Sequence, residues 1–242
     1  MSAEVFAALI GTSFATSTLT AAFGIGGGAA MLAVLASLLP PAALIPVHGV
    51  VQLGSNAGRA VLLRPHIRWS LAPAFLVGSL IGIALGGAVA LRLPPEAVQL
   101  GVGGFILWSV FAKPPAGLAR WSTLAGAVSS TLTMFFGATG PFVAAYVKAL
   151  NLDRHGHVAT HAALMTAQHL LKSLFFGIFG FAFAPWSALV VGMILAGLAG
   201  TWAGRHVLNR FSDPGFRKVL NLMLILLALR LIWVGLRPLL GA

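Results

Sequence analysis

Long hydrophobic stretches make up most of the chain, and two of them are interrupted by glycine-rich breaks. The breaks read FGIGGG at positions 23–28 and FGATGP at positions 136–141. Glycine is a poor helix former, and the apolar segment that follows each break is too short to cross a bilayer alone. We therefore predict a broken helix that forms a re-entrant hairpin at 5–39, and a second one at 122–150.

The other hydrophobic blocks are long enough to cross a membrane as helices, and polar or proline-containing turns separate them. None shows the ten-residue alternation that is typical of lipid-facing β-barrel strands. Each half of the chain has three predicted spans, at 42–63, 71–91 and 97–112 in the first half and at 158–183, 185–204 and 219–236 in the second. We predict an all-α integral membrane protein with a first repeat at 1–112, a linker at 113–121 and a second repeat at 122–242.

Glycine and polar residues recur at a fixed spacing in the two halves. Equivalent positions lie 113 residues apart: Gly24 and Gly137, His48 and His161, Arg59 and Lys172. Small residues repeat at a separation of 114: Gly78, Gly82 and Gly86 with Gly192, Ala196 and Gly200. This regularity indicates an internal duplication, and small residues at four-residue steps predict close helix packing.

The lysine and arginine residues of the connections predict the orientation in the membrane. If each broken helix returns to its own side, most of these cations share one face, and only Arg92 and Arg237 lie clearly on the other. The positive-inside rule then gives two inverted repeats in the cell (inner) membrane, with both termini on the non-cytoplasmic side. Eight plain spans would distribute the cations about evenly between the faces, and this layout stays an alternative.

Composition excludes an ordinary soluble chain. Hydrophobic residues make up 59% of the 242 positions and charged residues 8%, and the mean hydropathy is +0.97. The formal charge of +11 comes from cations spread over short connections, so it indicates topology rather than a nucleic-acid partner. The sequence contains no cysteine, which leaves no disulfide or thiolate chemistry, and no cofactor is expected.

A polar helix follows each broken helix. On a helix, four candidate residues of the first half share one face about 100° wide: His48, Gln52, Asn56 and Arg59. The equivalent face of the second half carries His161, Gln168, His169 and Lys172. A lysine or arginine at the bilayer centre costs roughly 2.5 to 3.5 kcal/mol on insertion scales, so we expect both faces to border a cavity. Alternatively, Arg59 extends to the basic surface, and the histidines only join helices by hydrogen bonds.

The glycine breaks supply the second part of the candidate site, because restarting helices present unpaired N–H groups and a positive dipole end that favour an anion. Candidate residues there are Gly26, Gly27, Gly28, Thr139 and Gly140. The acidic residues Glu4, Glu96, Asp153 and Asp213 all lie at the termini or in connections, which disfavours a cation site. We expect a small anionic substrate between the repeats, with a histidine as the candidate for proton coupling.

Other functions fit parts of this pattern. The imidazoles of His48, His161 and His169 suit a transition-metal permease, although the nearby Arg59 and Lys172 would repel a cation. An intramembrane enzyme is disfavoured because the sequence has no Gly-x-Ser-x-Gly turn. An anion channel and a homodimer both stay open.

The glycine motif at 24–28, its counterpart at 137–141 and the polar stretches 46–59 and 160–172 are similar to those of the TauE/SafE family of sulfite exporters. The resemblance covers essentially the whole chain. It implies transport of small anions, particularly sulfite, sulfonates or related organosulfur acids, generally as export driven by the proton motive force. Many members have a proline shortly after the first glycine run, whereas this chain reads AAML at 29–32.

Overall fold

The computed structural model describes residues 1–23, 26–90, 93–111, 121–207 and 214–240. These residues form ten α-helices and no strand: α1 (Ala3–Phe23), α2 (Gly27–Leu38), α3 (Pro41–Leu62), α4 (Ala72–Ala90), α5 (Pro95–Phe111), α6 (Ser122–Phe136), α7 (Gly140–Lys148), α8 (Arg154–Ile178), α9 (Ser187–Val207) and α10 (Pro214–Leu236). Short 3₁₀ turns lie at Arg64–His66, Trp69–Leu71, Ala184–Trp186 and Arg237–Leu240. The prediction of an all-α protein is confirmed for the described residues.

Several of these helices have the length and composition of membrane spans. In the described part of the chain, three segments meet both conditions: Ala3–Ala22, Trp69–Ala90 and Ala184–Gly204. The first lies in the arm that the sequence analysis assigned to a hairpin, and its length alone allows a full crossing. The helices α3 and α8 have 22 and 25 residues, and the polar residues that they carry lower their hydropathy.

Both glycine-rich segments interrupt a helix. After α1 ends at Phe23, Gly26 precedes α2 with a φ of 102°, and after α6 ends at Phe136, Gly137 follows with a φ of 78°. Both values lie in the left-handed region that favours glycine. Gly24 and Ile25, which belong to the first break, lie outside the described residues, as does the predicted linker apart from Trp121.

The bounds of two second-half helices differ from the predicted spans. The helix α8 begins at Arg154 instead of 158, because Asp153 Oδ1 accepts a hydrogen bond from Gly156 N at 2.9 Å and caps the helix. It ends at Ile178 instead of 183, where Gly180 has a φ of 95° and Phe181 N donates to Phe176 O at 2.8 Å. The helix α10 begins at Pro214 instead of 219, since proline suits the first helical turn.

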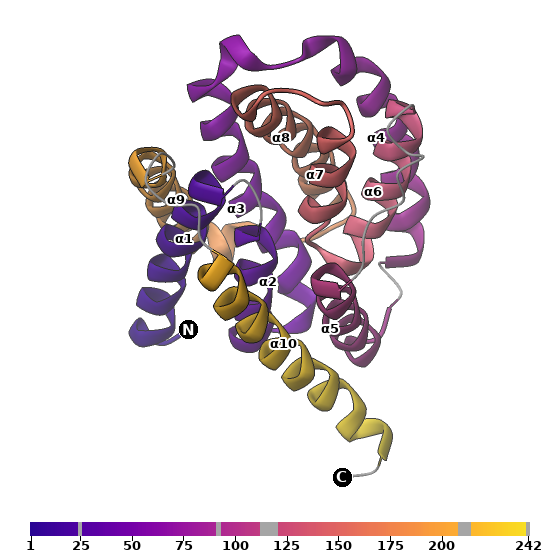
Figure 1. Ribbon diagram of the computed structural model, residues 1–242. Coiled ribbons are helices and arrows are strands. Elements are labelled where there is room, and N and C mark those ends of the chain that lie inside the picture. Colours follow the sequence, from indigo (N-terminus) through magenta and orange to yellow (C-terminus); the bar gives the residue numbers. More distant parts are fainter. Residues whose placement is uncertain (24–25, 91–92, 112–120, 208–213, 241–242) are drawn as a thin grey trace.

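The helices of the two halves pair with each other across the molecule. The helix α1 packs on α9, and its counterpart α6 packs on α4; in addition, α3 packs on α8 and α5 packs on α10. Exchanging the halves maps this set of pairs onto itself. In Figure 1 the α1 and α9 pair and the α4 and α6 pair lie on opposite sides, with α3, α7 and α8 between them.

Glycine stripes bring the outer pairs into backbone contact. A Cβ atom added at Gly78 would collide with the carbonyl oxygen of Thr123, and one at Gly82 with that of Ala127. On the other side, a Cβ at Gly200 would collide with the carbonyl oxygen of Phe14. The close packing predicted for these small residues is confirmed.

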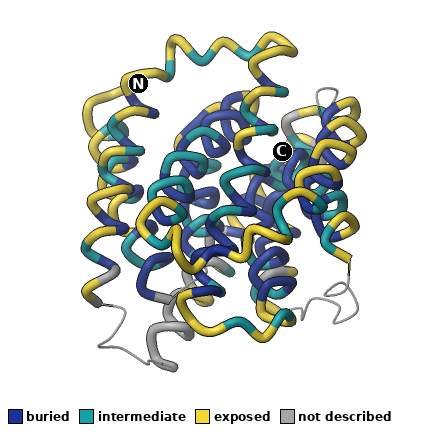
Figure 2. The backbone as a smooth tube through the Cα atoms, turned by 90° about the horizontal axis from the view of Figure 1, so that it is seen from above, coloured by how far each residue is buried: buried dark blue, intermediate teal, exposed yellow. Residues whose placement is uncertain are grey.

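Burial follows the arrangement of a protein surrounded by lipid. Figure 2 shows buried residues concentrated inside the bundle and exposed residues along its periphery. Large apolar side chains are exposed on the outer helices, among them Val77, Leu85, Leu195 and Trp202. Contiguous apolar surface of this kind is stable when hydrocarbon covers it. Polar residues lie instead at the centre, where α3 meets α8.

Candidate functional site

The polar faces of α3 and α8 meet inside the molecule. The two helices run antiparallel, since Arg68 N, after α3, donates to Thr160 Oγ1 near the start of α8, and Gly49, early in α3, lies beside Lys172, late in α8. All eight residues predicted on the two faces are buried: His48, Gln52, Asn56, Arg59, His161, Gln168, His169 and Lys172. The structure therefore brings the two predicted faces together.

Two histidines bind the starts of the two restarting helices in the same way. The Nε2 atom of His48 lies 3.1 Å from Gly28 O, and the Nε2 atom of His161 lies 3.1 Å from Gly140 O. A carbonyl oxygen only accepts, so Nε2 carries the hydrogen in both rings. The Nδ1 atoms of both rings are buried without a hydrogen-bond partner. Each ring thus holds a helix start with one nitrogen and keeps the other available.

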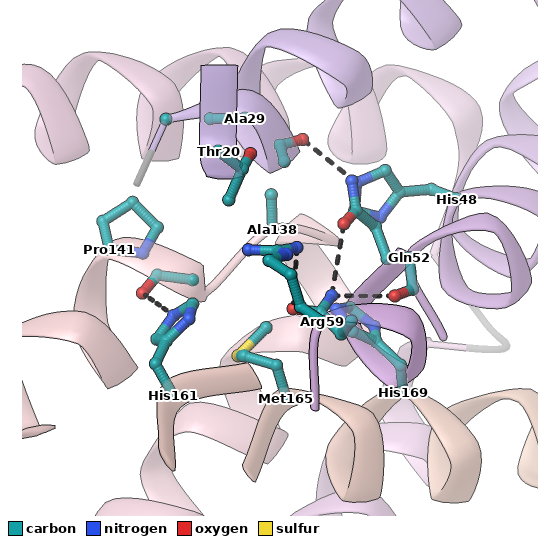
Figure 3. A pocket seen from close by; sticks show the side chains of 14 residues that line it. Thr20, Ala29, His48, Gln52, Arg59, Ala138, Pro141, His161, Met165 and His169 are labelled. Carbon is teal, nitrogen blue, oxygen red and sulfur yellow. Dashed lines mark hydrogen bonds between the residues drawn. The ribbon is translucent and has the colours of Figure 1, made fainter. Parts of the chain in front are cut away.

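A small central cavity lies between these histidines. Its volume is about 30 Å³, which is room for a water molecule or two. Nine of the predicted site residues line it: Gly26, Gly28, His48, Gln52, Asn56, Arg59, Gly140, His161 and His169. Figure 3 shows His48 and His169 on one side, His161 and Pro141 on the other, and Arg59 between them. The cavity thus combines both glycine breaks with residues from both polar faces.

Arg59 gives the cavity its positive charge. Its side chain is only 3% exposed, so it does not extend to the basic surface. The Nη2 atom donates to Asn56 Oδ1 at 3.2 Å and to Ser55 Oγ at 3.5 Å, whereas Nε and Nη1 are buried without a partner. An arginine has five N–H donors in a planar fork that matches oxyanions. The free nitrogens of Arg59 are therefore suited to binding a small oxyanion.

Lys172, the counterpart of Arg59, is fully buried but does not line the cavity. Its Nζ atom donates to Gly137 O at 3.1 Å and to Thr133 Oγ1 at 3.4 Å. These groups belong to the C-terminal end of α6, where unpaired carbonyls and the negative dipole end favour a cation. None of the described acidic residues pairs with Lys172. The C-terminal end of α6 therefore provides the hydrogen-bond acceptors for its ammonium group that a carboxylate would otherwise provide.

Three further predicted residues hold the breaks rather than line the cavity. Gln168 Nε2 donates to Thr139 Oγ1 at 2.7 Å, and Ser129 Oγ donates to Gln168 Oε1 at 2.8 Å. This network ties α8 to α6 and to the second break. A Cβ at Gly27 would collide with the carbonyl oxygen of Thr16, so this glycine allows α2 to pack closely on α1.

The sequence analysis missed several residues that line the cavity: Thr20, Ala29, Ala138, Pro141 and Met165. Three of them lie in or beside the glycine breaks: Ala138 and Pro141 belong to FGATGP, and Ala29 follows FGIGGG. Thr20 lies on a polar face of α1 that also contains Ser13, Thr16 and Ser17, and it is 113 positions before Thr133. Met165 is apolar and does not differ in pattern from the rest of the core.

A metal centre is not supported by the described residues. No group of three or more histidine, aspartate or glutamate side chains among them is placed to hold an ion. The rings of His48 and His169 meet edge to face at a centroid distance of 5.9 Å, and Nε2 of His48 is already bound to Gly28 O. The buried cations near these rings are Lys172, which acts on both, and Arg59, which acts on His169, and both repel a metal cation.

One of three comparisons with known proteins gave a match. No curated protein and no solved structure matches the chain. A family model, described as sulfite exporter TauE/SafE, matches residues 9–231. These residues include both glycine breaks, both polar helices and every residue that lines the central cavity. The chain therefore belongs to the TauE/SafE sulfite exporter family of membrane transport proteins.

Proposed function

We propose that the protein is a permease that carries a small oxyanion, such as sulfite, a sulfonate or a related organosulfur acid, through the central cavity. The observation that carries this proposal is Arg59, whose Nε and Nη1 atoms are buried without a partner in a cavity that no described carboxylate lines. A buried cation with free donors is costly unless an anion completes it. The substrate would supply the missing acceptors.

The starts of α2 and α7 support the same assignment. Gly28 and Ala29 of α2 and Gly140 of α7 line the cavity, so the positive ends of two helix dipoles point at one place. Helix ends that meet at a repeat interface are how many secondary transporters build substrate sites. The set of helix pairs that maps onto itself supports two related repeats, which we propose to be inverted in a cell (inner) membrane with the basic connections in the cytoplasm.

The size of the cavity favours a carrier over a channel. The cavity has room for a water molecule or two, whereas sulfite has four non-hydrogen atoms, so we propose that the helices separate before substrate enters. A channel instead needs a pathway that is wide enough along its whole length. We propose that the structure represents an occluded state of an alternating-access cycle.

His48 and His161 are the candidates for proton coupling. Since Nε2 of each ring already donates to a carbonyl, uptake of a proton would occur at Nδ1 and create one more N–H donor beside the cavity. Proton and anion would then stabilise each other in the site. This gives a physical reason for coupled movement of a proton with an anion.

Reconstituted proteoliposomes test the proposal. Arg59→Gln should reduce sulfite flux at least tenfold, whereas Arg64→Gln, which changes an exposed arginine five positions later, should leave it unchanged. Flux of sulfite and of a small sulfonate is compared with flux of Zn²⁺ in the same vesicles. Equal oxyanion flux in the wild type and Arg59→Gln, or transport of the metal alone, would refute the assignment.

A further inference from the structure

Two additional cavities lie at opposite ends of the α3 and α8 pair. The basic-end vestibule, of about 80 Å³, is lined by Arg59, Leu62 and Leu63 of the α3 end and by His155 and Val158 of the α8 start. The far-end vestibule, of about 300 Å³, is lined by Ala42 and Ile45 of the α3 start and by Phe176 of the α8 end. The 22 residues of α3 extend about 33 Å, close to the hydrocarbon thickness of a bilayer. The vestibules are therefore placed to serve opposite membrane surfaces.

The two vestibules are built from equivalent residues of the two repeats. Four pairs of lining residues lie 113 positions apart: Ala21 and Met134, Ala42 and His155, Ile45 and Val158, Leu63 and Phe176. In each pair, one member lines the basic-end vestibule and the other lines the far-end vestibule. Two unrelated cavities would not share four pairs of equivalent residues, so we take the two vestibules as the same feature in the two repeats.

Arg59 separates the central cavity from the basic-end vestibule, because its side chain lines both. Its counterpart Lys172 lines neither the central cavity nor the far-end vestibule. Lys172 is held by Gly137 O and Thr133 Oγ1, about one turn of α8 before Phe176, which lines the far-end vestibule. One basic side chain is thus anchored at a helix end, while two nitrogens of the other have no partner.

The two vestibules also differ in the polarity of the residues that line them. Among the residues that the structure describes, those that line the far-end vestibule are apolar residues and glycine, including Phe176, Phe179 and Phe181. The basic-end vestibule has Arg59 at its inner end and His155 in its lining, and Arg68 belongs to the same end of the bundle, since its N atom donates to Thr160 Oγ1 near the start of α8. The far-end vestibule is the larger of the two, but its apolar side chains offer an ion no hydrogen-bond partner. An anion is therefore attracted at the basic end and held back at the other.

We infer that Arg59 and Lys172 are the two gates of the transport cycle, Arg59 between the substrate site and the basic end and Lys172 between the site and the far end. This inference rests on the proposed transport function. When the Lys172 contacts to Gly137 and Thr133 are intact, the far-end route is closed. Substrate bound at Arg59 withdraws that side chain from the basic-end vestibule into the central cavity. Release to the far side requires Lys172 to leave the end of α6.

Thiol labelling tests the two routes, because the chain contains no cysteine and every introduced one is a unique reporter. His155→Cys and Ala42→Cys occupy equivalent, exposed positions of the two vestibules. A membrane-impermeant, sulfonate-bearing methanethiosulfonate is added to one side of oriented proteoliposomes. We expect it to reach His155→Cys from one side and Ala42→Cys from the other. Labelling of both from the same side would overturn the inference.

Ala138→Cys reports on the central cavity, where it is nearly fully buried. Adding Arg59→Gln should accelerate its labelling at least tenfold from the His155 side only, and adding Lys172→Gln should do so from the Ala42 side only. Arg64→Gln is the matched control and should change neither rate. Acceleration from the opposite side, or from both sides in one variant, would overturn the assignment of the gates.

A second set of variants leaves both charges in place. Leu63→Trp fills the basic-end vestibule and Phe176→Trp narrows the far-end one, so each should slow labelling of Ala138→Cys from its own side. Equal slowing from both sides would contradict two separate routes. Labelling does not depend on flux. If the labelling pattern is as expected but sulfite flux is absent, the proposed substrate is wrong and the assignment of the gates is supported. If sulfite flux is present but the labelling pattern is not, the assignment of the gates is wrong and the proposed substrate is unaffected.

Discussion

The side chain of Lys172 passes directly over Gly49: a Cβ atom added at Gly49 would lie 2.8 Å from Lys172 Cε. No side chain larger than hydrogen fits there without moving the lysine. The contact lies where α3 packs on α8, so the absence of a side chain at Gly49 leaves room for the buried Lys172.

Gly49→Ala should therefore displace Lys172 from the end of α6. We expect overpacking to lower the free energy of unfolding by about 1–3 kcal/mol and to lengthen the Nζ contact to Gly137 O. The measurement is thermal unfolding in detergent. Gly104→Ala is the control, because a Cβ there has no heavy atom within 4 Å. Equal midpoints for the two variants would contradict the contact.

Lys172→Met should separate stability from transport. The lysine carries a buried charge, and an apolar residue of similar length is often neutral or stabilising at such sites. Gly137 O keeps a partner after the change, because Thr133 Oγ1 donates to it at 2.9 Å. We expect an unchanged or higher unfolding midpoint together with loss of sulfite flux. The exposed Lys148→Met serves as the comparison, and a large loss of stability in Lys172→Met alone would show that the lysine is structural.

His161 should require a hydrogen-bond donor. His161→Phe removes the donor to Gly140 O, and an unpaired buried carbonyl costs about 1–3 kcal/mol, so the unfolding midpoint should fall. His161→Gln can still donate and should recover part of the loss. The same pair of changes at His48 tests the equivalent contact with Gly28 O. Identical unfolding midpoints for the Phe and Gln variants would show that this hydrogen bond does not contribute to the stability of the protein.

Gly82→Val should disrupt the packing of α4 on α6. A Cβ at Gly82 would collide with the carbonyl oxygen of Ala127, and neither backbone can move away without separating the pair. We expect loss of folded protein in detergent, measured by size-exclusion chromatography. Leu80→Val, on the exposed face of the same helix, should elute as the wild type does. Normal elution of Gly82→Val would refute the close approach.

The fold class and the helix breaks follow from the sequence because they depend on local properties. Apolar blocks of sufficient length make helices in a membrane, and FGIGGG and FGATGP cannot continue a helix without cost. The start of α8 was missed because the polar stretch before 158 resembles a loop, although Asp153 caps a helix there. The division into repeats and its orientation in the membrane stay predictions.

The candidate site was predictable only to the level of a helix face. Periodicity places Gln168, His169 and Lys172 on one side of α8, yet only His169 lines the cavity. Gln168 turns to Thr139 and Ser129, and Lys172 turns to the end of α6. These partners are 29 to 39 positions away in sequence. Which neighbour each side chain meets depends on tertiary packing, and spacing along one helix contains no information about it.

The exchange of partners between the halves has a consequence for how such a molecule moves. Because α1 is bound to α9 and α6 to α4 through backbone contacts, neither pair separates easily. In the alternating-access cycle that we propose, each of these pairs would move as one body, made of one helix from before the linker and one from after it. In a chain cut at the linker, each fragment would expose glycines that normally contact the backbone of the other, Gly78 and Gly82 in the first and Gly200 in the second.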